Sequence, residues 1–120
     1  MKRIAFTTSG RDLEATIDAR FGRAQGFLLY DLDSREVQFL ENRQARNSPQ
    51  GAGIQAAETI VKAGADALVT GHCGPKAYKV LEAAGVTVYN CSLKSVEEAL
   101  AAMRSGSLIP ATAADVEGHW

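Results

Sequence analysis

The stretch ADALVTGHCGPKAYKVLEAAGVTVYN, residues 65–90, contains two short apolar runs separated by a helix-like segment. The first run, residues 65–71, has the continuous apolar character of a buried strand. Pro75 suits the first position of a helix, and Gly85 suits its C-terminal cap. Residues 86–90 read as the next strand. The stretch therefore predicts a β-α-β unit with parallel strands.

Three further strand candidates precede this unit. Residues 3–8 form a β-branched and aromatic run that ends at Ser9 and Gly10. Residues 26–32 and 36–42 are two more such runs, and the short connection between them permits only antiparallel pairing. The polar segment 11–22 is expected to hold a short helix.

Two further helices are predicted around the β-α-β unit. Apolar side chains recur at helical spacing over residues 52–63, and Gly64 is a natural stop. Ser92 or Ser95 is the candidate N-cap of the last helix, with Gly106 beyond its end. The predicted fold class is α/β: a single domain with a mixed five-stranded sheet flanked by helices.

Length and composition limit the classes of function. A chain of 120 residues is long enough for one domain, expected over residues 1–107 with a C-terminal tail at 108–120. A net charge of -1 gives no general attraction to nucleic acid or to an anionic membrane. The first apolar run ends after Phe6, too early for a signal peptide, and no run reaches membrane-spanning length. Two cysteines make no disulfide framework, so a cytoplasmic protein is expected.

The candidate site lies where the two parallel strands end. Ligands of such sheets bind outside the carboxyl ends of the strands, where loops lead into helices. His72, Cys73 and Gly74 follow the first strand, and Asn90 and Cys91 end the second. Both cysteines are therefore expected on the same rim of the sheet.

This rim suits an anion. Backbone N–H groups are exposed at a helix start near Gly74 and at another in GAGIQ, residues 51–55. Each helix end contributes only about 0.3–1 kcal/mol when exposed, whereas micromolar binding needs roughly 8 kcal/mol. Arginines are the expected supplement, since they offer fixed donors to anions with several acceptors; the candidates are Arg20, Arg23, Arg43 and Arg46. Solvated surface arginines are the alternative.

The thiols allow two interpretations. Beside a helix start, Cys73 is a candidate thiolate for a soft metal or for redox chemistry, or else a small buried residue like Cys91. His72 is a candidate ligand, hydrogen-bond donor or loop cap. A closed zinc site needs about four ligands, and the chain adds only the distant His119 to these three residues. A structural zinc site is therefore not expected.

Common catalytic and nucleotide motifs are absent or incomplete. GAGIQA, residues 51–56, matches the form of a dinucleotide fingerprint, but it follows a polar loop that contains Pro49. The acidic residue that this motif requires about 20 positions later is replaced by Thr70, Gly71 and His72. No P-loop is present and no spacing supports a Ser-His-Asp set. The chain is therefore expected to be a binding protein and not an enzyme.

Two blocks of the sequence carry a resemblance to a known family. RFGRAQGFLLYDLD, residues 20–33, and GAGIQAAETIVKAGADALVTGHCGPKAYKVLEAAGVTVY, residues 51–89, resemble the dinitrogenase iron-molybdenum cofactor biosynthesis family, which includes NifX, NafY and the C-terminal region of NifB. The likeness runs from about residue 2 to 104. It is greatest to the orange-protein group of sulfate-reducing bacteria.

This resemblance implies a ribonuclease H-like fold and a non-covalently held molybdenum-copper sulfide cluster, or another molybdenum- or iron-sulfur cluster. The block G-x-G-P-N-A of the family corresponds to residues 71–77, with one additional residue before the Gly-Pro pair and Lys76 in place of asparagine. Lys76 adds positive charge at the helix start. The residues expected to form the cofactor site are Arg20, Arg23, Gly51, Gly53, Ile54, His72, Cys73, Gly74, Pro75, Lys76 and Tyr78, with Cys73 and His72 as candidate metal ligands.

Three functions remain open at this point. The first is storage or carriage of the cluster by a monomer that exchanges it with a donor or acceptor protein. The second is a regulatory module that binds phosphate or a nucleotide, because helix starts do not distinguish phosphate from thiomolybdate. The third is an enzyme that uses Cys73 as its redox thiol or nucleophile.

Overall fold

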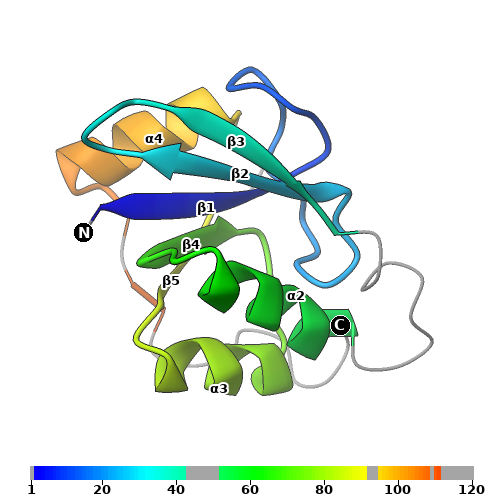
Figure 1. The fold of residues 1–120 in the computed structure, drawn as a ribbon. Helices are drawn as coiled ribbons and strands as arrows, with labels where there is room; N and C mark the ends of the chain where they lie inside the picture. Colours follow the sequence, from blue (N-terminus) through cyan, green and yellow to red (C-terminus); the bar gives the residue numbers. More distant parts are fainter. Residues whose placement is uncertain (1, 43–51, 92–94, 109, 112–120) are drawn as a thin grey trace.

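The fold is a mixed sheet with helices on both faces (Figure 1). A computed structural model describes residues 2–42, 52–91, 95–108 and 110–111. In chain order the elements are β1 (Arg3–Thr8), β2 (Gly26–Asp31), β3 (Val37–Glu41), α2 (Ala52–Lys62), β4 (Ala67–Thr70), α3 (Pro75–Ala83), β5 (Thr87–Asn90) and α4 (Val96–Ser105).

The five strands lie in the order β3-β2-β1-β4-β5. β2 pairs antiparallel with both β1 and β3, whereas β4 pairs parallel with both β1 and β5. The predicted hairpin, the parallel unit and the mixed five-stranded sheet are therefore confirmed. β1 is the central strand, with one antiparallel and one parallel neighbour.

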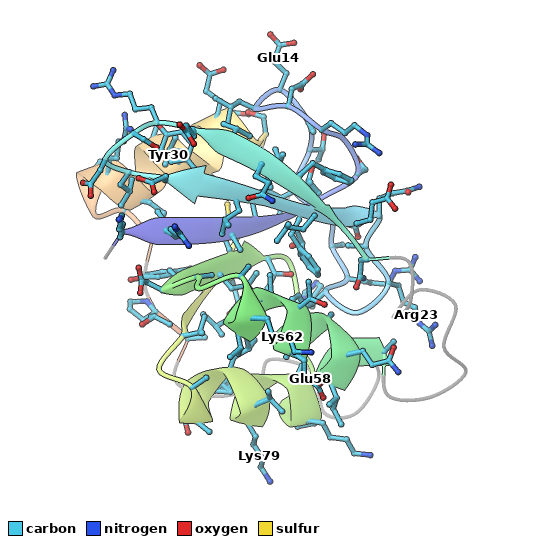
Figure 2. All side chains as sticks on the ribbon, in the orientation of Figure 1. Glu14, Arg23, Tyr30, Glu58, Lys62 and Lys79 are labelled. Atoms are coloured by element: carbon cyan, nitrogen blue, oxygen red, sulfur yellow. The ribbon has the colours of Figure 1, made fainter. Side chains whose placement is uncertain are left out.

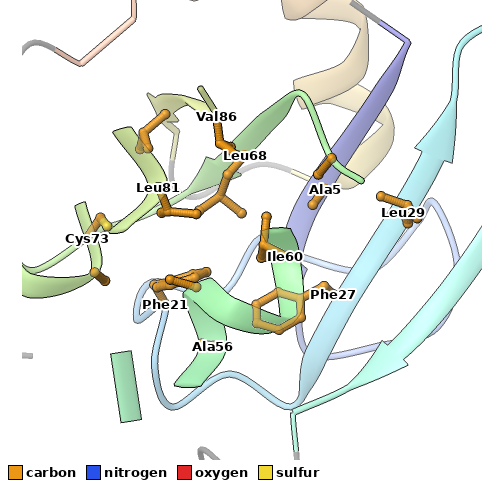
Figure 3. Packing of buried hydrophobic residues seen from close by; sticks show 14 of the residues in the cluster. Ala5, Phe21, Phe27, Leu29, Ala56, Ile60, Leu68, Cys73, Leu81 and Val86 are labelled. Atoms are coloured by element: carbon orange, nitrogen blue, oxygen red, sulfur yellow. The ribbon is translucent and has the colours of Figure 1, made fainter. Parts of the chain in front are cut away.

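The side chains of the sheet alternate between two apolar clusters. Ala5, Leu68 and Phe27 pack with Ile60 of α2 and Leu81 of α3 on one face (Figure 3). The other face holds a second cluster, formed by strand residues such as Phe6 and Leu28 together with Val96 and Leu100 of α4. Because strand side chains point alternately to opposite faces, both faces of the central strand are buried.

The ends of the helices follow the predicted signals. Pro75 begins α3, and Gly85 follows its end with φ of 80°. Ser95 caps α4, because its hydroxyl accepts from the backbone N–H of Glu98 while the Glu98 carboxylate accepts from the N–H of Ser95. Gly106 is left-handed, with φ of 76°. The other candidate cap, Ser92, lies outside the described residues.

The prediction of a short helix within residues 11–22 is wrong. This segment forms turns and isolated bridges. Its carbonyl groups serve α4 instead: Val96 donates to Ala15 (2.8 Å) and Glu97 donates to Leu13 (2.8 Å). These bonds satisfy N–H groups at the start of α4 that have no partner within the helix. The polar sequence of the segment gives no sign of this use of its backbone.

The last described residues cover the outer edge of β5. Pro110 bridges Tyr89, the Ala111 N–H donates to Val88 (2.8 Å), and the Tyr78 hydroxyl donates to the Ala111 carbonyl (3.0 Å). The domain boundary after residue 107 stays a prediction, and residues 112–120 lie outside the described part. No helix in the described ranges is long and apolar enough to cross a membrane.

Candidate functional site

The carboxyl ends of the parallel strands β1, β4 and β5 form one rim of the sheet. After β1 the chain continues to β2 on one side, whereas after β4 it continues through α3 to β5 on the other. Strand order therefore reverses between β1 and β4. In sheets of this kind such a reversal opens the usual binding crevice.

The segment from Asp18 to Phe21 crosses this reversal point. The Asp18 N–H donates to Thr7 at the end of β1 (2.9 Å), and the Gly71 N–H donates to Asp18 just after β4 (3.2 Å). The Phe21 N–H donates to His72 (3.3 Å). The segment is thus tied to both strand ends, and a ligand of this rim would lie outside it.

The crossing segment places Arg20 beside His72. These two residues form a parallel bridge, and the backbone N–H of Arg20 is held by the Asp18 carboxylate (2.9 Å). Arg20 is exposed and His72 is partly exposed. A pair separated by about 50 positions in the sequence is therefore adjacent at the rim.

Two glycines allow the loop to lie this close. A Cβ on Gly71 would lie 2.6 Å from the Cα of Ala19, and a Cβ on Gly22 would lie 2.9 Å from the backbone nitrogen of Gly53. Any larger residue would push the loop away. The loop that carries Arg20 and Arg23 is therefore pressed against both the end of β4 and the start of α2.

The start of α3 lacks a side-chain cap. Gly74 is its N-cap; it is buried and supplies no side-chain oxygen to the first N–H groups. Lys76 is exposed in the first turn. At the start of α2, Gly53 and Ile54 are partly exposed, and a Cβ on Gly53 would lie 3.3 Å from Ala77 of α3. The starts of the two helices are thus neighbours.

The two cysteines end adjacent strands but belong to different layers. Thr70 of β4 pairs with Asn90 of β5, and each cysteine follows soon after. Cys73 is 2% exposed within the cluster beneath α2 and α3 (Figure 3), whereas Cys91 is buried in the cluster beneath α4. The shared rim predicted for the two residues is correct for the backbone, but their thiols lie in separate apolar clusters.

The thiol of Cys73 is turned into the protein. Its Sγ donates to the Gly74 carbonyl (3.7 Å). Among the described residues, no group of three or more histidine, cysteine, aspartate or glutamate side chains is placed to hold a metal ion.

Tyr78 joins α3 to the end of the described chain. Burial raises the pKa of its hydroxyl, and the neighbouring Glu82 carboxylate and Cys73 thiol act in the same direction. The hydroxyl therefore stays protonated and donates to Ala111. The ring packs at the margin of the core cluster.

The sequence matches the dinitrogenase iron-molybdenum cofactor family over residues 1–106. The chain belongs to this family. A protein of Methanocaldococcus jannaschii is 30% identical over 95 residues, which cover 77% of this chain and 80% of the relative.

Two solved structures extend the family likeness to the fold. The apo form of the orange protein from Desulfovibrio gigas has a TM-score of 0.94 and 36% identity, over 97% of this chain and 98% of that one. A NifB-type protein from Thermotoga has a TM-score of 0.84 and 34% identity, over 98% of this chain and 100% of that one. The α/β fold and the orange-protein likeness expected for this family member are thereby confirmed.

Two buried polar residues at this rim were not predicted. Asn42, 3% exposed, donates through Nδ2 to the carbonyls of Gly22 (3.2 Å) and Ala24 (3.1 Å). Thr70 is fully buried, and its Oγ1 has no hydrogen-bond partner in the described part of the chain. No local signal marks Asn42, since it follows Glu41 at the end of a strand that already contains polar residues. Four other candidates, Gly51, Arg43, Arg46 and His119, lie outside the described residues.

Proposed function

We propose that this chain binds an anionic molybdenum-containing metal-sulfide cluster without a covalent bond, and stores it or carries it to another protein. Membership of the cofactor family supports a cofactor-binding or carrier role. One observation carries the proposal: the Arg20 and Arg23 loop lies against the end of β4 and the start of α2, and the start of α2 in turn lies beside the first turn of α3. Positive charge and backbone N–H groups thus converge at one rim.

The chemistry of a sulfide cluster matches this arrangement. Sulfide-rich anions accept hydrogen bonds from N–H groups, are attracted by cations and tolerate apolar contact through their soft sulfur atoms. The uncapped start of α3 supplies N–H groups near Gly74 and Lys76, and Ile54 and Tyr78 supply apolar surface. Arg20, Arg23 and Lys76 supply charge, all three with exposed side chains.

The finer assignments are part of the proposal. The cluster is of the molybdenum-copper sulfide type, the protein acts as a cytoplasmic monomer without turnover, and a donor or acceptor protein exchanges the cluster with it. His72 and Cys73 are the candidate metal ligands. Coordination by Cys73 requires that the cluster displace its thiol from the Gly74 carbonyl.

The direct test is reconstitution. Apo-protein is mixed with tetrathiomolybdate and a copper salt and then desalted, and its metal content and visible spectrum are recorded. We expect molybdenum, copper and sulfide to elute with the protein in fixed proportion. If the metals wash away while inorganic phosphate or a nucleotide binds the same rim, the carrier function is wrong and the phosphate module replaces it.

The electrostatic part is tested with Arg20→Ala/Arg23→Ala. At about 1 kcal/mol for each exposed cation, the double variant should bind roughly thirtyfold more weakly and with a smaller dependence on salt. The matched control is Lys2→Ala/Lys62→Ala, which removes two exposed cations away from the rim and should bind as wild type. Cys73→Ser should retain the cluster; its loss would show that the thiolate is a ligand.

A further inference from the structure

Asn42 connects the end of β3 to the loop that carries Arg23. Its backbone N–H donates to Gln25 (3.1 Å), and its side-chain amide donates to Gly22 (3.2 Å) and Ala24 (3.1 Å). One residue thus satisfies three carbonyls of a short loop. The side chain is 3% exposed, so these bonds are shielded from water.

The two carbonyls bound by the amide lie on either side of Arg23. Gly22 and Ala24 are its direct neighbours in the chain, so the backbone is held before and after the arginine. Gly22 is also the residue pressed against the backbone of Gly53 at the start of α2. Figure 2 shows the Arg23 side chain extending outward from this fixed point.

The attachment of Arg20 is different. Its backbone is held by Asp18, and the following residue, Phe21, is bound to His72. None of these bonds involves Asn42. The backbone at Arg20 and the backbone at Arg23 are therefore held by separate sets of hydrogen bonds, although the two residues are only three positions apart.

We propose that Asn42 is a positioning residue for anion binding, which fixes the backbone of Arg23 so that its guanidinium is directed at the rim beside the start of α2. This inference rests on the proposed function. Without the amide donor, the Gly22 and Ala24 carbonyls lose their partner, and the backbone that carries Arg23 is no longer fixed on both sides. The entropy cost of ordering this long side chain then falls on the binding step instead of on folding.

A double-mutant cycle with tetrathiomolybdate alone as the probe tests this. We expect Arg23→Ala and Asn42→Ala each to weaken binding by roughly fivefold. The double variant should bind no more weakly than Arg23→Ala, because Asn42 acts through that arginine. In an Arg20→Ala background, Asn42→Ala should still cost its full factor. Asn42→Ser, which keeps one donor, should recover part of the affinity and provides the measurement if Asn42→Ala does not fold.

The outcomes separate the two hypotheses. If wild type binds thiomolybdate but Asn42→Ala binds equally well, or if its effect adds fully to that of Arg23→Ala, Asn42 has only a structural role and this inference is wrong. A lower melting temperature with unchanged affinity leads to the same conclusion. If wild type binds thiomolybdate only with the copper salt present, the same cycle and the same expected factors apply to that mixture. If it binds neither, the proposed function fails, and the positioning role fails with it.

Discussion

The two ends of the parallel strands are held together by different kinds of contact. At the amino end, the Asp66 carboxylate accepts from the backbone N–H groups of Lys2 (2.8 Å) and Arg3 (3.0 Å), and the Arg3 guanidinium lies 3.7 Å from Asp31. At the carboxyl end, backbone bonds of the crossing segment and close glycine contacts perform this task.

Charged side chains therefore take part in holding the amino end together, whereas the cations at the carboxyl end are exposed beside loops that are held mainly through the backbone. At the amino end, carboxylates lie beside the basic residues and engage the local backbone. At the carboxyl end, the Asp18 carboxylate holds one backbone N–H, but most loop contacts are backbone bonds and close glycine contacts, and cationic side chains remain exposed. The stability that the amino end contributes should therefore depend more strongly on pH. The stability that the carboxyl end contributes should depend more on close backbone packing.

The largest effect is expected from Gly71→Ala. The new Cβ would lie 2.6 Å from Cα and 2.8 Å from O of Ala19, so the crossing segment would have to move. The hydrogen bond from the N–H of residue 71 to the Asp18 carbonyl would then be lost. Chemical denaturation should show a loss of at least about 2 kcal/mol. Thiomolybdate binding should weaken in parallel.

Gly85→Ala is the matched control. Gly85 has φ of 80°, but no atom lies within 4 Å of its added Cβ. It should cost only about 1 kcal/mol of backbone strain and leave anion binding unchanged. Equal losses in both variants would contradict the importance of close packing at the rim.

A smaller effect of opposite sign is expected from Thr70→Val. Its buried hydroxyl has no partner among the residues that the structure describes, so its removal should raise the free energy of unfolding by about 1 kcal/mol. Thr7→Val is the control on the neighbouring strand, since Thr7 Oγ1 donates to Val69 (3.2 Å), and it should lower stability by about 1 kcal/mol. Two denaturation curves decide the matter; destabilisation by Thr70→Val would show that the hydroxyl has a structural partner.

The smallest effect concerns the amino end. Hydrogen bonds from the N–H groups of Arg3 and Lys2 lower the pKa of Asp66 below its usual value of 3.8. The carboxylate therefore stabilises the fold above about pH 4, and this contribution is lost as pH falls through the lowered folded pKa. Asp66→Asn should reduce the dependence of stability on pH in this acidic window. An unchanged acid profile would show that Asp66 is not responsible for it.

The fold could be predicted because local signals and the tertiary structure agree. Pro75, Gly85 and Ser95 mark helix ends through their own backbone preferences or side chains, whatever surrounds them. The short connection after β2 permits only a hairpin. The helix prediction for segment 11–22 failed because backbone groups of this segment bond to residues outside it, such as Thr7 and Val96.

The site could be predicted only as far as topology reaches. Parallel strands with loops at one end indicated the rim, and the start of α3 indicated the N–H groups. The depth of Cys73 and the separate layers of the two thiols depend on which way each side chain faces beyond the strand ends. Asn42 was missed because its partners, Gly22 and Ala24, meet it only in the folded state.

The central position of β1 has a consequence for synthesis of the protein. Its antiparallel neighbour β2 follows closely, but 62 positions separate Thr7 from its contact Val69 on the parallel side. At roughly 5–20 residues per second, a ribosome makes β4 several seconds after β2. During that interval the apolar edge of β1 has no strand beside it. A nascent chain that stalls before residue 67 would therefore expose unpaired backbone groups of β1 that can pair with another chain. Such a chain would depend on chaperones, however stable the finished domain is.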